Sequence, residues 1–384
     1  MKFLFVVTDF DIGGITVSLK NLTDELIRRG NEVSILNLPD ADTFPVDFHP
    51  NIRFISLQGR ALKWNVGMRE FHRASGGKKI ALLAFGIFKK VLTKLELWYK
   101  YIFSTIQTID CDVAIAYRQS SECYYLITRK TTAKRTVAFI HSDFDGNCSP
   151  WISLLRDVDK IACVSNDWSM KFCNTFPTLA DKVGTVYNLF DADSIIEKAK
   201  QFAPQYNSDA FNIVTVARIE TSQKKIDTIP EICALVQEKA GRKIKWYIVG
   251  DGSDRPLVEE AIRATHTEDS VFLLGAKKNP YPYIKNADLF VLTSSWESYG
   301  MVVQEALILG TPVVAGNYGA LKEVIQSPFE GIITENSITG IAHGIIRLLK
   351  DKELYYKMKK HLAQYQYSSD TVYQQLLSVC KENR

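Results

Sequence analysis

Glu297 and Glu305 are the two side chains whose type and spacing most clearly suit chemistry in this 384-residue sequence. They flank a point where an apolar run at 289–293 gives way to a polar turn, and a helical pattern then begins near Tyr299 and Gly300. The N-terminus of such a helix carries unpaired N–H groups and partial positive charge, which favours a diphosphate. Glu305 would lie roughly 6 Å along the helix, within reach of ribose hydroxyls, and Glu297 would face a sugar. For two acids alone, capping and solvation explain the pattern better.

The elements that must position these glutamates are predicted to be alternating strands and helices. Short apolar runs alternate with helical patterns along the chain, which indicates βα units and parallel sheets. In the first helix, Leu19, Leu22 and Leu26 form an apolar face, and Gly30 lies where a C-terminal cap belongs. Strands are predicted at 2–8, 32–37, 53–56, 112–116, 136–141, 160–165, 183–186, 212–217, 245–249, 271–274, 289–293 and 312–315.

The chain is long enough for two such domains, and a polar stretch at 201–209 is predicted to link them. The predicted fold class is therefore α/β, with two Rossmann-like doubly wound domains facing an interdomain cleft. The first domain is expected at 1–200 and the second at 201–370, followed by a C-terminal helix at 371–384 that packs back on the first. Ligands of such sheets bind beyond the carboxyl ends of the strands.

The composition excludes several classes of protein. The net charge of +4 is too small to indicate nucleic-acid binding. Seven cysteines, none in C-x-x-C spacing, argue against a disulfide framework or structural zinc and favour a reducing compartment. The apolar start from Phe3 to Val7 is too short for a signal peptide, and no apolar run reaches about 18 residues. A cytoplasmic protein without a transmembrane helix is expected.

A basic segment stands apart from the rest of the chain. Between Arg60 and Asp110 there are ten Lys and Arg residues against three acidic ones. Between Lys78 and Ile106 the cations are interleaved with aliphatic and aromatic residues, which suits a helix lying on an anionic membrane surface. The alternative is an ordinary amphipathic helix that packs on its own domain and exposes a solvated basic face.

The glutamate pair lies within a longer pattern that resembles a known family. Glu297 and Glu305 form Glu-x7-Glu inside ESYGMVVQEALILGTPVVA, which is similar to the donor-site signature of glycosyltransferase family 4, whose fold is GT-B. The resemblance covers essentially the whole chain. It includes the Gly-Gly turn of the opening strand and the segments YNLFD, VARIETSQKKID, IVGDGSDRPLVEE and LLGAKKNPYPYIKNADLFVLTS.

The resemblance implies a role for each matching residue. Arg218 and Lys224 would hold the diphosphate of a nucleotide-sugar donor and stabilise the charge of the leaving group. His141, which ends a strand, would contact the donor sugar, as would Glu297. The donor-binding set would further comprise Gly13, Gly14, Gly250, Gly275, Ser298, Tyr299, Gly300, Met301, Val302 and Glu305. With these cations present, no metal ion or other cofactor is expected.

Three positions depart from the family pattern. Ser298 stands where a glycine often follows the first glutamate, and Lys225 replaces a frequent glycine beside Lys224. Thr16 replaces an acidic residue often found two positions after the Gly-Gly turn, which concerns how that loop handles the acceptor.

The resemblance implies a retaining, metal-independent glycosyltransferase whose leaving phosphate takes the proton of the acceptor on the front face of the sugar. Residues 279–294 resemble the branch that uses UDP-sugars, with GDP-mannose as the alternative donor. The 1–200 domain would serve the acceptor, a glycan or a lipid-diphosphate-linked glycan, and the 201–370 domain the nucleotide sugar. Because of the basic segment, the expected place of work is the inner face of the cell membrane, in capsule, exopolysaccharide or O-antigen synthesis.

Two other classes of function share this architecture. A nicotinamide-dependent dehydrogenase would need G-x-G-x-x-G after a strand with an acid about 20 residues further on, and that pattern is not found. A non-catalytic partner subunit that binds sugar nucleotides is the other alternative, and the intact Arg218, Glu297 and Glu305 argue against it.

Overall fold

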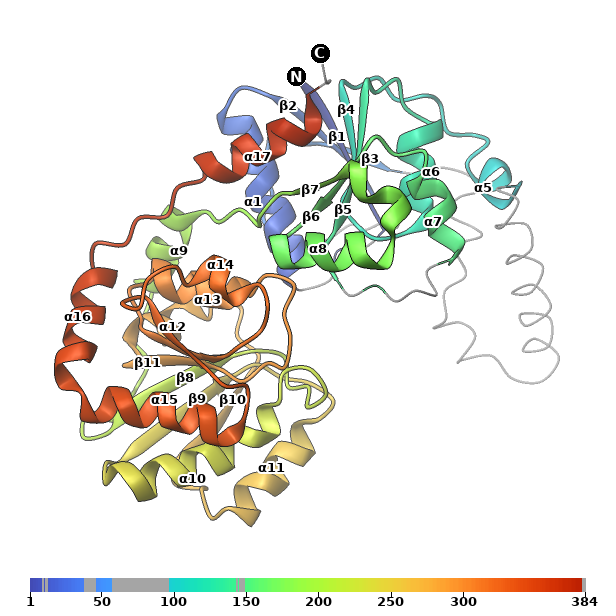
Figure 1. Cartoon of the computed structure of the whole chain (residues 1–384). Coiled ribbons are helices and arrows are strands. Elements are labelled where there is room, and N and C mark those ends of the chain that lie inside the picture. The colour runs from blue at the N-terminus through green and yellow to red at the C-terminus, as the bar shows by residue number, and fades with distance from the viewer. Residues whose placement is uncertain are drawn as a thin grey trace. The chain divides into compact units, whose positions relative to one another are not determined.

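The computed structural model divides the chain into two compact units (Figure 1). The first unit is Met1–Leu189 with Asp370–Arg384, and the second is Phe190–Ser369. The residues that the structure describes are 1–8, 10, 13–37, 46–56, 97–142, 144 and 149–381.

The first unit is built on a seven-stranded parallel sheet of order β3-β2-β1-β4-β5-β6-β7. Its strands are β1 (Lys2–Val7), β2 (Glu32–Asn37), β3 (Arg53–Ser56), β4 (Val113–Ala116), β5 (Arg135–Ile140), β6 (Lys160–Cys163) and β7 (Val183–Thr185). Its helices are α1 (Gly14–Arg28), α5 (Leu97–Ile102), α6 (Ser121–Arg129), α7 (Ser149–Leu155), α8 (Asn166–Thr175), the short 3-10 helix η1 (Pro177–Lys182) and α17 (Asp370–Cys380).

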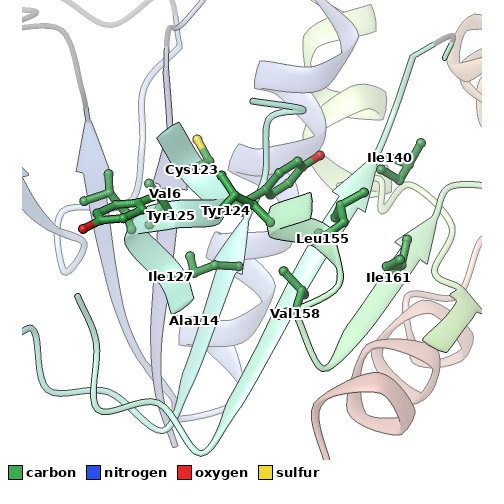
Figure 2. Packing of buried hydrophobic residues seen from close by; sticks show 14 of the residues in the cluster. Val6, Ala114, Cys123, Tyr124, Tyr125, Ile127, Ile140, Leu155, Val158 and Ile161 are labelled. Carbon is green, nitrogen blue, oxygen red and sulfur yellow. The ribbon is translucent and has the colours of Figure 1, made fainter. Parts of the chain in front are cut away.

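The core of the first unit follows from strands that are apolar on both faces. In β1 every residue after Lys2 is buried, as expected for a parallel sheet covered by helices on both sides. Figure 2 shows part of the resulting cluster, in which Tyr124 of α6 lies toward Leu155 and Tyr125 lies on the side of Val6. The predicted apolar face of α1 is confirmed, because Leu19, Leu22 and Leu26 are all buried.

The second unit repeats this plan with a six-stranded parallel sheet of order β10-β9-β8-β11-β12-β13. Its strands are β8 (Phe211–Val216), β9 (Ile244–Val249), β10 (Val271–Gly275), β11 (Leu289–Leu292), β12 (Val313–Gly316) and β13 (Gly331–Thr334). Its helices are α9 (Ala192–Ala199), the 3-10 helix η2 (Ile226–Thr228), α10 (Ile229–Ala240), α11 (Arg255–Ala264), α12 (Tyr281–Asn286), α13 (Met301–Ile308), α14 (Leu321–Val324), α15 (Ile338–Lys350) and α16 (Lys352–Leu362).

A buried chain of hydrogen bonds holds the centre of the second sheet. Trp246 Nε1 donates to Thr215 Oγ1 at 3.0 Å, and Thr215 Oγ1 donates to the Val291 carbonyl at 2.7 Å. These bonds tie β9, β8 and β11 together across the point where the strand order reverses, which is the ligand-binding position of doubly wound sheets. The two-sheet Rossmann-like fold predicted from the sequence is confirmed.

The boundary between the units differs from the predicted linker. The chain enters the second unit at Phe190, because α9 packs against α12 and α13. Within the stretch predicted as a linker, Tyr206 stacks on Tyr247 at 4.4 Å between ring centroids and donates to the Tyr283 carbonyl. Strand β13 was not among the predicted strands.

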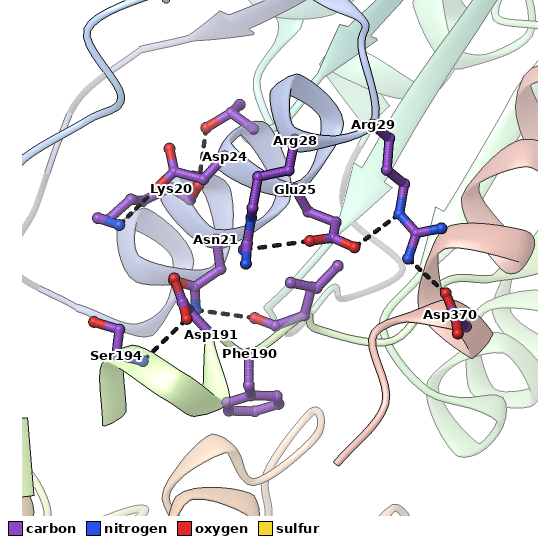
Figure 3. A network of polar contacts seen from close by, with 12 residues as sticks. Lys20, Asn21, Asp24, Glu25, Arg28, Arg29, Phe190, Asp191, Ser194 and Asp370 are labelled. Atoms are coloured by element: carbon purple, nitrogen blue, oxygen red, sulfur yellow. Dashed lines mark hydrogen bonds and ion pairs between the residues drawn. The ribbon is translucent and has the colours of Figure 1, made fainter. Parts of the chain in front are cut away.

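The C-terminal helix α17 packs on β5 and β6 of the first unit and is held there by Arg29. Figure 3 shows that Arg29 bridges Glu25 of α1, at 2.7 Å, and Asp370 of α17, at 2.6 Å. The guanidinium also lies 4.1 Å from the centroid of the Tyr373 ring. One side chain thus joins the first helix of the unit to the last.

We expect Arg29→Ala to loosen α17 selectively. The substitution removes partly exposed ion pairs and a cation–π contact, worth about 1–2 kcal/mol together. Amide hydrogen exchange in α17 should therefore speed up roughly 5- to 30-fold, the factor corresponding to that free energy. Arg28→Ala is the matched control, because Arg28 pairs with Glu25 on its own helix. Equal exchange in α17 for both variants would contradict the assigned role of Arg29.

Candidate active site

The loop after β8 is fixed by a close approach to the loop after β9. The Ala217 and Ile219 amides donate to the carbonyls of Val249 and Asp251. A Cβ on Gly250 would overlap the Ala217 carbonyl oxygen, and one on Gly252 would overlap that of Ile219. Glycine is therefore required at both positions. Gly252 was not among the predicted site residues, although it lies in the quoted IVGDGSD segment.

The same loop brings Lys224 to Glu297. Lys224 Nζ lies 2.6 Å from Glu297 Oε1, and both side chains are largely buried. Thr293 Oγ1 donates to the Lys224 carbonyl, and the Ser295 amide donates to the Gln223 carbonyl. The loops after β8 and β11, which carry the predicted donor-site residues, are thus joined by backbone contacts as well as by an ion pair.

Lys224 and Lys225, which were adjacent candidates in the sequence, have different conformations. Lys225 has φ of +52°, in the left-handed region that favours glycine. This conformation accounts physically for the glycine that the family pattern often has there. Lys224 is the one whose ammonium group meets the carboxylate.

Asn336, which follows β13, holds the glutamate loop from the other side. Its Nδ2 donates to the carbonyls of Ser294, at 3.0 Å, and Ser295, at 3.3 Å, and lies 3.4 Å from that of Asn317. Asn336 was not among the residues predicted from the sequence, because β13 was not predicted. The sequence did offer one signal near this residue. Asn336 and Ser337 stand directly before a helical pattern, and Ser337 is the N-cap residue of α15.

Helix α13 begins next to Glu297, as predicted. Its N-cap residue is Gly300, which has φ of +93°. Because glycine has no side chain, this residue provides no side-chain cap for the helix. Ser298 and Tyr299 connect Glu297 to this start, and Met301 is the first helical residue, followed by Val302. Tyr299 is buried, and the centroid of its ring lies 6.3 Å from that of the Phe190 ring. Its side chain therefore packs within the second unit.

Glu305 is buried in α13 and has an unusual acidity. Among the described residues it accepts one side-chain hydrogen bond, from Tyr281 Oη at 3.4 Å. Burial raises the pKa of Glu305 from 4.5 to about 7, and the Tyr281 hydrogen bond opposes this shift. Because the Glu305 carboxyl accepts so few hydrogen bonds from the described residues, it is suited to accept hydrogen bonds from hydroxyl groups of a ligand.

Arg218 and Gly275, two further predicted residues of the second unit, make contacts of their own. The Arg218 side chain is 70% exposed, and its Nε lies 3.7 Å from Glu220 Oε2. Gly275 has φ of +73°, and its carbonyl accepts from the Gly250 amide at 3.1 Å. Gly275 therefore supports the Gly250 turn.

In the first unit, His141 follows β5 and is buried. Its ring lies 4.4 Å from the Tyr117 ring and 5.5 Å from the Phe139 ring, measured between centroids. Gln119 Oε1 accepts from the amides of His141 and Ser142. Burial, aided by the charge of Arg118, lowers the pKa of His141 to about 3, so the imidazole is neutral. Within the described part of the chain its Nε2 has no hydrogen-bond partner.

The glycine turn lies in the same unit at the start of α1. Gly13 is the N-cap residue and Gly14 the first residue of the helix. Thr16 is buried, and its Oγ1 lies 3.4 Å from Arg118 Nη2, so a basic residue faces the position where the family often has an acid. Arg118 was not among the predicted site residues, and it lies near enough to His141 to affect its pKa.

Most of the basic segment lies outside the described residues. This applies to 57–96, which includes Lys78, Lys89, Lys90 and Lys94. At its described end, Trp98 is buried in the core of the first unit and Tyr101 is exposed. Trp98 therefore packs on its own domain. Across the residues placed with certainty, none of the helices has the length and apolar character needed to cross a bilayer.

The buried carboxyl of Glu305 makes a prediction about stability. A carboxyl that binds its proton more tightly when folded stabilises the protein fully below pH 4.5, and this contribution is lost as the pH rises through about 7. A pKa difference of this size corresponds to about 3 kcal/mol. The free energy of unfolding of Glu305→Gln minus that of wild type should therefore be larger at pH 8 than at pH 5, by up to that amount. Urea unfolding at both pH values measures this difference. An equal wild-type-to-variant difference at both pH values would contradict the buried, protonatable carboxyl.

Most of the second unit matches the model of a known protein family. Residues 197–365 match the model of the family described as glycosyl transferases group 1. The chain is 29% identical to N-acetyl-alpha-D-glucosaminyl L-malate synthase of Bacillus anthracis, over 51% of this chain and about half (50%) of that relative. It is 25% identical to an uncharacterized glycosyltransferase of Methanocaldococcus jannaschii, over 99% of this chain and 98% of the relative.

Solved structures share the fold of the whole chain. TarM of S. aureus, crystallised with UDP and other ligands, superposes with a TM-score of 0.71 at 15% identity, over 99% of this chain and 100% of TarM. The chain therefore has the GT-B fold, and residues 197–365, within its second unit, match the model for glycosyl transferases group 1; these findings support a glycosyltransferase enzyme.

Proposed function

We propose that the protein is a retaining glycosyltransferase of the family 4 type, which transfers a hexose or N-acetylhexosamine from a UDP-sugar. The acceptor is a lipid-linked or other glycan in capsule, exopolysaccharide or O-antigen synthesis. The observation that carries the proposal is the ion pair of Lys224 and Glu297, 2.6 Å apart at the carboxyl ends of β8 and β11 and beside the start of α13.

The arrangement supports a division of roles. Lys224 is a fixed cation, and the N-terminus of α13 adds partial positive charge nearby, so together they suit a departing diphosphate without a metal ion. Arg218, which is exposed beyond the same strand, can add a planar fork to the phosphate oxygens. Glu297 binds sugar hydroxyls, and the poorly satisfied Glu305 accepts from the ribose.

In the proposed reaction the acceptor hydroxyl attacks the anomeric carbon from the side of the leaving phosphate. The bond from that carbon to the phosphate oxygen breaks, and the phosphate takes the acceptor's proton. No protein base is needed in this step. The neutral imidazole of His141 fits a hydrogen-bonding contact to the donor sugar better than a cationic role.

A UDP-sugar is proposed for two reasons. Residues 279–294 resemble the branch of the family that uses UDP-sugars, and TarM, which has the same fold, was crystallised with UDP. The lipid-linked acceptor is proposed from the basic segment between Lys78 and Ile106, which would bring the enzyme to an anionic membrane surface.

Glu305→Ala should strongly reduce transfer from the preferred donor. Losing charge-assisted hydrogen bonds of about 1.5–3 kcal/mol should lower kcat/KM about 10- to 150-fold. Transfer and hydrolysis would be measured by mass spectrometry with UDP-glucose, UDP-galactose, their N-acetylated counterparts and GDP-mannose. Glu238→Ala, an exposed substitution on α10, is the matched control and should leave the rate unchanged.

The outcomes separate the alternatives. Unchanged transfer by Glu305→Ala would refute the donor site as described. Turnover of GDP-mannose alone would replace the UDP-sugar assignment. Tight binding of a nucleotide sugar with neither transfer nor hydrolysis would favour a non-catalytic partner subunit.

Membrane association is tested separately. Replacing Lys89, Lys90 and Lys94 with Glu should reduce sedimentation with vesicles rich in phosphatidylglycerol, because each basic residue near such a surface contributes about 1 kcal/mol. The control reverses three exposed lysines of the second unit, Lys350, Lys352 and Lys360. Equal sedimentation of the two variants would contradict a specific role for the basic segment.

A further inference from the structure

Two hydroxyl groups of the second unit are buried without a hydrogen-bond partner among the described residues. They are Ser294 Oγ and Tyr318 Oη, on side chains of residues that are 1% and 5% exposed. Most buried hydroxyls in folded proteins are paired, and an unpaired one costs roughly 1–3 kcal/mol. Two such groups in one unit therefore call for an explanation.

Both hydroxyls lie at the same edge of the sheet. Ser294 is two residues beyond the end of β11, and Tyr318 is two residues beyond the end of β12. These strands are parallel neighbours, with Leu292 paired to Ala315. The Ser294 carbonyl is held by Asn336, so its residue is fixed in place between the two loops.

Tyr318 Oη is aimed at the start of α13. A Cβ on Gly300, the N-cap residue, would overlap this oxygen, so the hydroxyl lies directly against the Gly300 backbone. Gly300 brings no side chain that could cap the helix or satisfy the hydroxyl. The unpaired hydroxyl therefore lies at the positive end of α13, a helix of eight residues.

We propose that the hydroxyls of Tyr318 and Ser294 donate hydrogen bonds to phosphate oxygens of a nucleotide bound at the N-terminus of α13. This assignment rests on the proposed function, because it requires a nucleotide ligand, and it adds two phosphate-binding residues to the site. Neither residue belongs to the Glu-x7-Glu motif or to the set predicted from the sequence.

The chemistry favours a phosphate over a sugar hydroxyl. Burial, with the nearby charge of Glu297, raises the pKa of Tyr318 well above its usual value, so the phenol keeps its proton and can donate. A phosphate oxygen is a strong acceptor, and the end of α13 supplies positive potential for it. The ligand then satisfies hydroxyls that the protein alone leaves unpaired.

The test uses the full chain and compares Tyr318→Phe with Tyr355→Phe. The Tyr355 hydroxyl donates to the Asp288 carbonyl at 3.1 Å, just before β11 and so at the opposite end of that strand. Dissociation constants for UDP and for uridine would be measured by calorimetry, and melting temperatures without ligand. Tyr318→Phe should weaken UDP about ten-fold, leave uridine unchanged and not lower the melting temperature. Tyr355→Phe should lower the melting temperature and leave UDP binding unchanged.

Three results would overturn the proposal: unchanged UDP affinity of Tyr318→Phe, equal weakening of UDP and uridine, or a melting temperature lowered as much as in Tyr355→Phe. Ser294→Ala gives the same test with a smaller change, should Tyr318→Phe fail to fold. A wild-type protein that does not bind UDP refutes the UDP donor, and GDP and ADP then serve as probes of the shared phosphates. Binding of none of the three would overturn both proposals.

Discussion

The backbone contacts of the loop after β8 hold the candidate site together. On one side, Gly250 and Gly252 allow the carbonyls of Ala217 and Ile219 to approach within a distance that no side chain would permit. On the other side, Thr293 and Ser295 bond to the backbone of Lys224 and Gln223. Because the loop is fixed at both edges, the Lys224 ammonium group has a defined position relative to Glu297 before any ligand arrives.

This fixed geometry is consistent with how glycosyl transfer can be promoted without a metal ion. Charge that develops on a leaving diphosphate is best stabilised by groups that do not have to reorganise. By our proposal, those groups in the second unit are a largely buried lysine, the start of α13 and two hydroxyls that lack partners among the described residues. The Glu305 carboxyl, with a pKa near neutrality, is likewise left short of partners inside the protein.

Several features of the site carry a stability cost that the rest of the unit offsets. Lys225 adopts a left-handed conformation, and the hydroxyls of Tyr318 and Ser294 are buried with no hydrogen-bond partner in the described part of the chain. In the sheet beneath them, by contrast, Trp246 is bonded to Thr215, and Thr215 is bonded to the Val291 carbonyl of β11. Local strain above a well-paired core is typical of sites that bind ligands.

The sequence alone determined the parallel sheets, most strand positions and the placement of Glu297 and Glu305 around a helix start. These features depend on apolar periodicity and on short motifs, which are local in the chain. Only the tertiary structure decided that Lys224, not Lys225, meets Glu297, that Asn336 holds the glutamate loop, and that α9 belongs to the second unit. The lack of hydrogen-bond partners for the Ser294 and Tyr318 hydroxyls among the described residues could not be predicted from the sequence either, because such partners are often residues far away in the chain. Local patterns specify elements, whereas partnership between side chains exists only once the elements are packed.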